Sequence, residues 1–294
     1  MKKRNNKVIV LIVVAVLFAV SLLIFILNYS KDNSSFSILE KKWINDNTSN
    51  VLDISVYNDV PVYGKSGKGV IFDLLDDFTT TYGINFNKIS YSVDSSSNLN
   101  KNAFRVLNNN ENLTNKDILL YEDNYVLVST EEEVINNIND IDNHTVAVLK
   151  TDLNTVSNDL SEVKKISYLQ KENVNELEEA LKNKETNYVI VPYNMYMDFI
   201  LKNDLHILYH LSDISKKYVL TIENKTFLDI MKKYYLGYQK NKQQTSYKTN
   251  FLSEFFYDKE ITEADRMSYN SSSYNVGYIT CLLYTSDAAD ERSS

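Results

Sequence analysis

The sequence is poor in the residues that most often build metal and thiol sites. Of 294 residues, one is cysteine, three are histidine and two are proline. Without Cys281, which lies near the C-terminus, the chain has no thiol, and this excludes disulfides, cysteine-ligated metals and thiol catalysis. His206 and His210 have i, i+4 spacing, but no glutamate stands between them as the H-E-x-x-H zinc motif requires. We therefore expect no metal site and no cofactor.

Catalytic motifs are missing as well. The sequence has no G-x-S-x-G motif for a serine nucleophile. The stretch VPVYGKSGKGV, Val60 to Val70, has two glycines at the P-loop separation, Gly64 and Gly69. However, Val70 stands where that motif needs the lysine that reaches the phosphates. The sequence thus predicts that residues 60–70 form a turn whose shape depends on glycine. Because no catalytic motif is present, we do not expect this chain to be an enzyme.

Basic stretches are absent outside the N-terminus, and the net charge is −8 with a pI near 5.1. A nucleic-acid-binding protein needs a basic face to neutralise phosphates. The composition therefore argues against a nucleic-acid partner.

The N-terminus carries the one long apolar run. After MKKRNNK, the residues from Val8 to Leu27 include no charge, and about 20 apolar residues cross a bilayer as a helix. The alternative, a cleaved signal peptide, has a shorter apolar region and a small-residue cleavage site. We expect an anchor at residues 8–28, a cytoplasmic segment at 1–7, and an extracytoplasmic body behind a tether at 29–50. The chain is then a single-pass protein of the cell membrane.

The C-terminus, CLLYTSDAADERSS from Cys281 to Ser294, resembles the translated read-through of a sequencing adapter. We exclude it from fold reasoning and expect the natural chain to continue past Thr280. Residues 259–280 are expected to form a linker, in which YNVGYI, Tyr274 to Ile279, indicates the first strand of a second domain.

The body begins with a strand, loop, helix and strand. Residues 51–59 alternate as a strand, and the glycine loop follows. Ile71, Leu74, Leu75 and Phe78 then have helical spacing, with Gly83 as the stop. Residues 84–92 form a second strand, with Ile84, Phe86 and Ile89 expected to face the core. This order is a βαβ unit, and ligands of open α/β sheets bind at the carboxyl ends of such strands.

The alternation continues along the chain. We expect helices at 101–109 and 131–143, and two short strand-like runs around an acidic turn within 117–130. Further strands are expected at 144–150 and up to Val191, followed by a long helix at 225–242 and a terminal helix at 246–258. Between these two strands, Thr151 and Asp152 are expected to cap a helix.

Three stretches in this order carry a family resemblance: LDISVYNDVPVY with the following helix, INDIDNHTVAVLKTDLN, and ETNYVIVPYNMYMDFILKN. Together they resemble the bacterial extracellular solute-binding protein family 3, which has the type 2 periplasmic binding fold, over residues 51–258. The resemblance implies two α/β lobes, the first at about 51–128 and 205–258, the second at about 140–200.

The sequence departs from that family at two positions. Relatives that bind amino acids carry an arginine that clamps the carboxylate before the crossing strand, whereas Glu122 and Asp123 stand here without one. The acidic residue that holds the ligand ammonium in relatives is replaced by Pro192-Tyr193-Asn194. These two departures argue against an ordinary α-amino acid as the ligand, and they leave open a degenerate or repurposed cleft.

The expected ligand-binding residues come from both lobes. Thr151 and Thr155 lie where a helix N-terminus suits an anion, although plain N-capping explains them equally well. The tyrosines offer amphipathic walls for a cleft. The complete expected set is Asn58, Asp59, Tyr63, Tyr125, Thr151, Thr155, Tyr193 and Asn194.

The resemblance, together with the anchor, implies extracytoplasmic binding of a small polar solute. We expect a membrane-anchored sensor input that passes lobe closure to a downstream signalling domain. The alternative is the solute-binding component of an ABC uptake transporter, with a permease as partner.

Overall fold

The computed structural model describes residues 36–93, 99–163 and 165–271. The expected anchor, the first part of the tether and the C-terminal tail lie outside these residues. Among the helices that are described, none has the length and apolar character needed to cross a membrane.

The described strands form one large mixed sheet and one small hairpin. The large sheet has eight strands in the order β4-β1-β5-β10-β6-β9-β7-β8. Its strands are β1 (Val51–Tyr57), β4 (Asn85–Tyr91), β5 (Asn102–Leu107), β6 (Asp117–Ser129), β7 (Thr145–Leu149), β8 (Ser167–Lys171), β9 (Tyr188–Pro192) and β10 (His206–Ile222). The hairpin pairs β2 (Asp59–Val60) with β3 (Gly64–Lys65).

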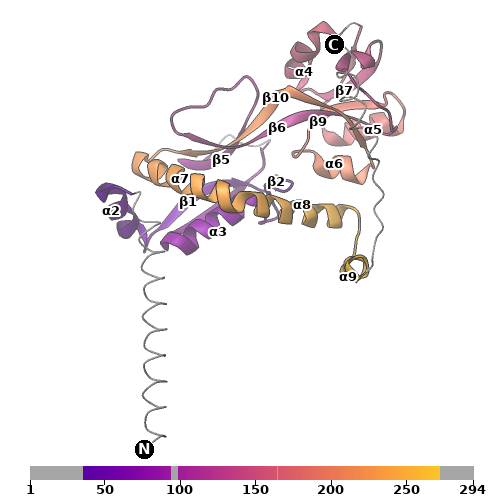
Figure 1. Ribbon diagram of the computed structural model, residues 1–294. Coiled ribbons are helices and arrows are strands. Elements are labelled where there is room, and N and C mark those ends of the chain that lie inside the picture. Colours follow the sequence, from indigo (N-terminus) through magenta and orange to yellow (C-terminus); the bar gives the residue numbers. More distant parts are fainter. Residues whose placement is uncertain (1–35, 94–98, 164, 272–294) are drawn as a thin grey trace, which may run out of the picture.

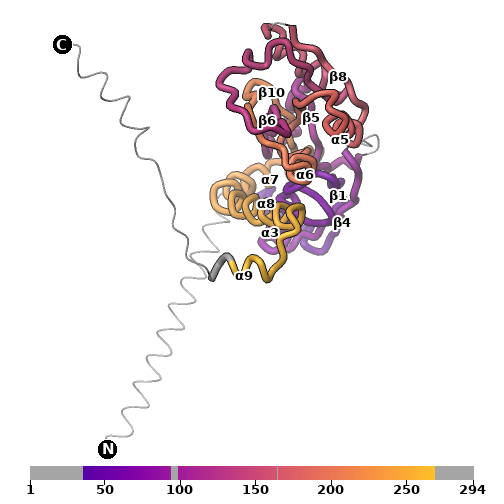
Figure 2. The backbone as a smooth tube through the Cα atoms, turned by 90° about the vertical axis from the view of Figure 1, so that its right-hand side faces the viewer, coloured from indigo at the N-terminus to yellow at the C-terminus, as the bar shows by residue number. Residues whose placement is uncertain are grey.

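Helices cover this sheet in two groups, which makes the molecule bilobed (Figures 1 and 2). The first lobe has α2 (Ile38–Asn47), α3 (Val70–Tyr82), α7 (Lys225–Tyr238), a π-helical turn (Gln239–Gln243) and α8 (Gln244–Asp258). The second lobe has α4 (Leu153–Asp159), α5 (Val174–Lys182), α6 (Met197–Lys202) and 3-10 turns at Ile138–Ile141 and Leu160–Glu162. The short helix α9 (Glu263–Ser271) follows α8.

The predicted βαβ unit is confirmed. β1 pairs in parallel with β4, and α3 connects them. Ile71, Leu74, Leu75 and Phe78 are buried, and Gly83 ends the helix with φ 71°. Of the predicted core residues of β4, Ile84 is buried and Phe86 is half-buried, but Ile89 is 40% exposed. The prediction for Ile89 is therefore wrong, because Ile89 comes three residues after Phe86 in β4 and so points to the opposite face of the strand.

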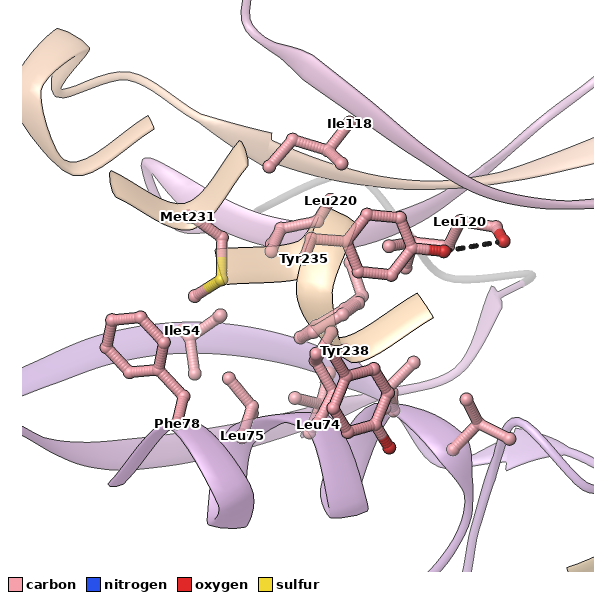
Figure 3. Packing of buried hydrophobic residues seen from close by; sticks show 14 of the residues in the cluster. Ile54, Leu74, Leu75, Phe78, Ile118, Leu120, Leu220, Met231, Tyr235 and Tyr238 are labelled. Carbon is pink, nitrogen blue, oxygen red and sulfur yellow. Dashed lines mark hydrogen bonds between the residues drawn. The ribbon is translucent and has the colours of Figure 1, made fainter. Parts of the chain in front are cut away.

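The core of the first lobe lies between α3, the sheet and α7. In Figure 3, Leu74, Leu75 and Phe78 face Ile54 and Met231 across this layer. The hydroxyl of Tyr235 donates to the Leu120 carbonyl at 2.9 Å, so the polar end of a buried ring is satisfied.

The second lobe has a core on each face of its sheet. Val146 and Val148 of β7 pack with α4, and Ala147 and Leu149 pack on the opposite face with α5 and α6. This is the period of two expected of a strand that is buried on both sides, and it confirms the predicted strand at 144–150.

Two long strands join the lobes. β10 pairs with β5 of the first lobe, β6 pairs with β9 of the second lobe, and the two strands pair with each other from one lobe to the other (Figure 1). Their register shifts between Leu211 and Ser215 of β10, opposite Tyr125 and Asn124 of β6. We call this irregularity the hinge. The two short runs predicted within 117–130 are thus one strand, because Asp123 at its centre is held by tertiary hydrogen bonds rather than by a turn.

Two predicted helices are wrong. Residues 102–107 form β5, which fills the place between β1 and β10, so sheet pairing overrides the local pattern. Residues 131–143 contain only the 3-10 turn Ile138–Ile141, where Asn137 and Asp140 form a capping box. Asn and Asp side chains compete with helical hydrogen bonds in this way.

The glycine loop serves backbone geometry, as predicted. Gly69 has φ 121°, and a Cβ there would lie 2.6 Å from the Tyr63 carbonyl. The first two N–H groups of α3 donate to the carbonyls of Val62 and Tyr63 at 3.0 Å. Because the loop itself satisfies the helix N-terminus, these N–H groups are not free for a phosphate.

Candidate solute-binding cleft

A polar cleft of about 370 Å³ lies between the lobes. We call it the interlobe cleft. The first lobe lines it through the end of β4 and the segment around β5, the second lobe through residues near α4 and α6, and β10 through Lys216. The lining residues are Tyr91, Val93, Leu99, Arg105, Val106, Asn108, Glu111, Thr151, Met195, Tyr196 and Lys216.

Arg105 is the feature of the cleft most suited to a ligand. It is the single arginine between Arg4 and Arg266, and it lies half-buried on β5. Its guanidinium makes no hydrogen bond or ion pair within the described residues. An arginine that lines a cleft with its donors free is well placed to bind a carboxylate or another oxyanion.

Lys216 and Asp152 form a buried ion pair beside the cleft. The Lys216 Nζ lies 2.8 Å from Asp152 Oδ1, with side chains 8% and 1% exposed. The same ammonium donates to Asn108 Oδ1 at 3.3 Å. The pair therefore links β10, the start of α4 and the segment after β5.

The hinge contains a second buried carboxylate, Asp123. It accepts hydrogen bonds from the backbone N–H groups of Asn194 and Met195, at 2.8 and 2.9 Å, and from the Tyr218 hydroxyl at 2.8 Å. The Asn194 amide adds a bond of 3.1 Å to the same carboxylate. Burial raises the pKa of Asp123, although these donors oppose the shift. The network ties β6 to the segment after β9, and so holds the lobes at the hinge.

The predicted site residues of the glycine loop bond to neighbouring loops. Asn58 Oδ1 accepts from the Gly67 N–H at 2.7 Å, within the loop. Asp59 accepts from the Val93 N–H at 3.1 Å and from the Ser92 hydroxyl, and so fixes the end of β4. Neither residue lines the interlobe cleft, although Val93, which Asp59 holds, does.

Tyr63 and Asn194 belong to one aromatic and polar cluster. The Tyr63 ring stacks on Tyr121 at 4.9 Å, and the Tyr121 hydroxyl accepts from the Asn194 amide at 3.1 Å. The Tyr247 hydroxyl donates to Asn194 Oδ1 at 2.9 Å. The structure thus brings these two predicted residues into one cluster, in which Tyr63 is buried by ring contacts and the amide of Asn194 is occupied by protein partners.

The remaining predicted residues lie in the second lobe. Thr151 lines the interlobe cleft, whereas the described lining does not include Thr155, which is half-buried on α4. Tyr125 is buried in the core, where burial and the Asp152 carboxylate raise its pKa. Tyr193 is half-buried and packs on the core that contains α5 and α6. Solute binding by these residues stays a prediction.

The expected capping of α4 by Asp152 does not occur. Asp152 precedes the helix with helical dihedrals, and its side chain makes no capping bond. It pairs with Lys216 instead.

The sequence did not point to three residues that line the cleft: Arg105, Asn108 and Lys216. The local pattern predicts a helix around Arg105 and Asn108, and nothing in the sequence near Lys216 shows that β10 brings it to the cleft. The isolation of Arg105 in the sequence was the signal that could have found it.

A second, more open hollow of about 690 Å³ lies beside the hinge. It follows the free edge of β6 next to the π-helical turn, and its lining includes Tyr63, Tyr121, Glu122, Gln244 and Tyr247. It has no arginine or lysine in its described lining. The hollow thus lacks the charge that makes the interlobe cleft suitable for an anion.

A cluster of three carboxylates joins α6 to α8. Oxygens of Asp198, Glu254 and Asp258 lie within 4.8 Å of one another. Lys65 forms ion pairs with Asp198 and, at 2.8 Å, with Glu254. The lysine therefore already provides a cation within this cluster.

Comparison with known proteins identifies the fold. No family model matches the sequence, and no curated protein matches it. The periplasmic VFT2 domain of BvgS from Bordetella pertussis matches with a TM-score of 0.53 at 13% identity, over 73% of this chain and 98% of that domain.

Two substrate-binding structures match similarly. The amino acid ABC transporter substrate-binding protein AbpA from Streptococcus pneumoniae, bound to L-arginine, has a TM-score of 0.50 at 16% identity, over 73% of this chain and 99% of that one. Substrate-binding domain 2 of GlnP from Lactococcus lactis, in an open conformation, has a TM-score of 0.52 at 12% identity, over 68% and 94%. The chain therefore has the bilobed α/β fold of periplasmic binding proteins.

Proposed function

We propose that this chain binds a small anionic solute between its lobes and that it does so outside the cytoplasmic membrane, held by the helix at residues 8–28. The main support for this proposal is the position of Arg105. It lines the interlobe cleft, and its guanidinium has no ion-pair partner in the described structure. Thr151 lies in the same cleft and comes from the other lobe. An oxyanion bonded to both residues would favour lobe closure, because each lobe contributes part of its binding energy.

The chain would act as a binding module rather than as an enzyme, and as the input of a sensor. The anchor supports this role, since a tethered module can pass closure to a downstream signalling domain. The alternative is a solute-binding component of an ABC transporter, as AbpA is described. Sequencing the gene and its surroundings from source DNA distinguishes the two: a downstream signalling domain supports the sensor, and a neighbouring permease gene supports the transporter.

The test is a thermal shift screen of the full chain in detergent against carboxylates, amino acids, sugars and peptides. A solute at a hundredfold excess over its Kd stabilises the folded state by about 2.7 kcal/mol. We expect an anionic compound to raise the Tm, and Arg105→Ala to weaken its binding by about ten- to a hundredfold, the value of a charged hydrogen bond.

Gln244→Ala is the matched control, because this exposed residue lines the hollow beside the hinge and not the interlobe cleft. It should bind the compound as the parent does. If Arg105→Ala binds equally well and Gln244→Ala does not, the solute site is the hollow and the proposal is wrong. A panel without any stabiliser would also contradict it.

A further inference from the structure

The surroundings of Asp152 resemble a cation site that is already filled. Asp152 Oδ1 bonds to the Lys216 ammonium, while Asp152 Oδ2 is buried and has no hydrogen-bond partner among the described residues. The carboxylate is not used as a helix cap. A buried carboxylate is costly unless a cation compensates it, and Lys216 is the cation that forms an ion pair with Asp152 in the described structure.

Lys216 reaches this carboxylate from the wall of the interlobe cleft. It lines the cleft together with Arg105, Thr151 and Asn108, and its ammonium contacts Asn108 as well as Asp152. Its side chain is nearly buried, so the ammonium has lost most of its water and depends on these two acceptors. The space beside Asp152 that a ligand ammonium could occupy therefore holds a side chain of the protein.

We infer that Lys216 is an internal counterion that fills the cation position of the cleft, so that the solute is an organic acid without an amino group beside its carboxylate. The solute half of this inference rests on the proposed function. An α-amino acid would bring its ammonium towards Arg105 and Lys216, two like charges. The carboxylate of Glu111 also lines the cleft, but one of its oxygens accepts the Asn108 N–H at 2.7 Å.

The first part of the inference, that Lys216 is the counterion of Asp152, is tested without any solute. Lys216→Ala leaves Asp152 buried and unpaired, together with a cavity of the size of the lost side chain. Methylammonium, ethylammonium and propylammonium chlorides should each raise the Tm of this variant saturably, and should leave the Tm of the parent unchanged. Sodium chloride at equal ionic strength controls for screening, and tetramethylammonium controls for size.

A double variant, Asp152→Asn with Lys216→Met, removes both charges and should fold without responding to the amines. If Lys216→Ala does not fold alone, its refolding from urea with ethylammonium present supports the inference. Failure to refold under those conditions, while the double variant folds, contradicts it. An equal response of Lys216→Ala and the double variant also contradicts it.

The solute half is tested with matched pairs on the parent chain: succinate against aspartate, and glutarate against glutamate. We expect each diacid to bind at least about tenfold more tightly than its amino acid. Equal or tighter binding of the amino acids overturns this half, even if the amine experiment succeeds. Conversely, failure of the amine experiment leaves the role of Arg105 in the proposed function intact.

Discussion

Asp123 shows how much a single residue can contribute to the geometry between the lobes. Its carboxylate is fully buried and accepts from Asn194 and Met195, which follow β9, and from Tyr218 of β10. Asp123→Ala would leave these donors without an acceptor, and each unsatisfied buried group costs about 1–3 kcal/mol. We expect a loss of at least about 3 kcal/mol in the free energy of unfolding, measured by urea denaturation.

The neighbouring residue offers the matched control. Glu122 is exposed, and Glu122→Ala should change the stability by less than about 0.5 kcal/mol. If the two alanine variants unfold at the same urea concentration, the hinge network contributes nothing to stability and this account of Asp123 is wrong.

At the scale of the elements, we expect the packing of α6 on α8 to depend on pH. The Asp258 side chain is buried at the end of α8, where it faces Asp198 and Lys202 of α6, with Lys65 and Glu254 nearby. Burial, followed by the charge of Asp198, raises the pKa of Asp258 from 3.8 to about 6. A carboxyl group with a raised pKa stabilises the fold when protonated, so its contribution is complete below about pH 3.8 and is lost as the pH rises through about 6.

Asp258→Asn keeps the neutral form at every pH. We therefore expect the variant to gain stability relative to the parent between about pH 4 and 7, as measured by urea midpoints across that range. Asp46→Asn is the control, because Asp46 forms only an exposed pair with Lys42 and should not change the pH profile. A parallel profile for the Asp258 variant and the parent would show that the cluster does not titrate in this range.

At the scale of the whole molecule, the prediction concerns the membrane. If residues 8–28 span it with the basic end inside, the body from residue 29 onward lies outside the cell. Protease added to intact cells should then digest the tyrosine-rich body, while the undigested protein remains in the membrane fraction. A cytoplasmic marker protein should stay intact in the same cells. Release of a soluble mature form would indicate a cleaved signal peptide instead.

The sequence predicted the parts of the fold that local patterns encode. The apolar face of α3 and its end at Gly83 follow from helical spacing, and β7 follows from a continuous apolar run. The helix predicted around Arg105 failed, because the position of β5 between β1 and β10 depends on strands distant in the sequence. Arg105 was absent from the predicted site residues for the same reason, since it enters the cleft only as part of that strand.

The sequence by itself determined which functional groups the protein has. The chain is acidic, has no thiol outside its tail, has one arginine between residues 51 and 258, and has an apolar segment near its start. It also determined the βαβ unit, because helical and strand periods act over a few residues. Only the tertiary structure decided that Lys216 pairs with Asp152, and that Arg105 and Thr151 line the same cleft. Such contacts depend on the register of β6 and β10, which the packing of both lobes sets together.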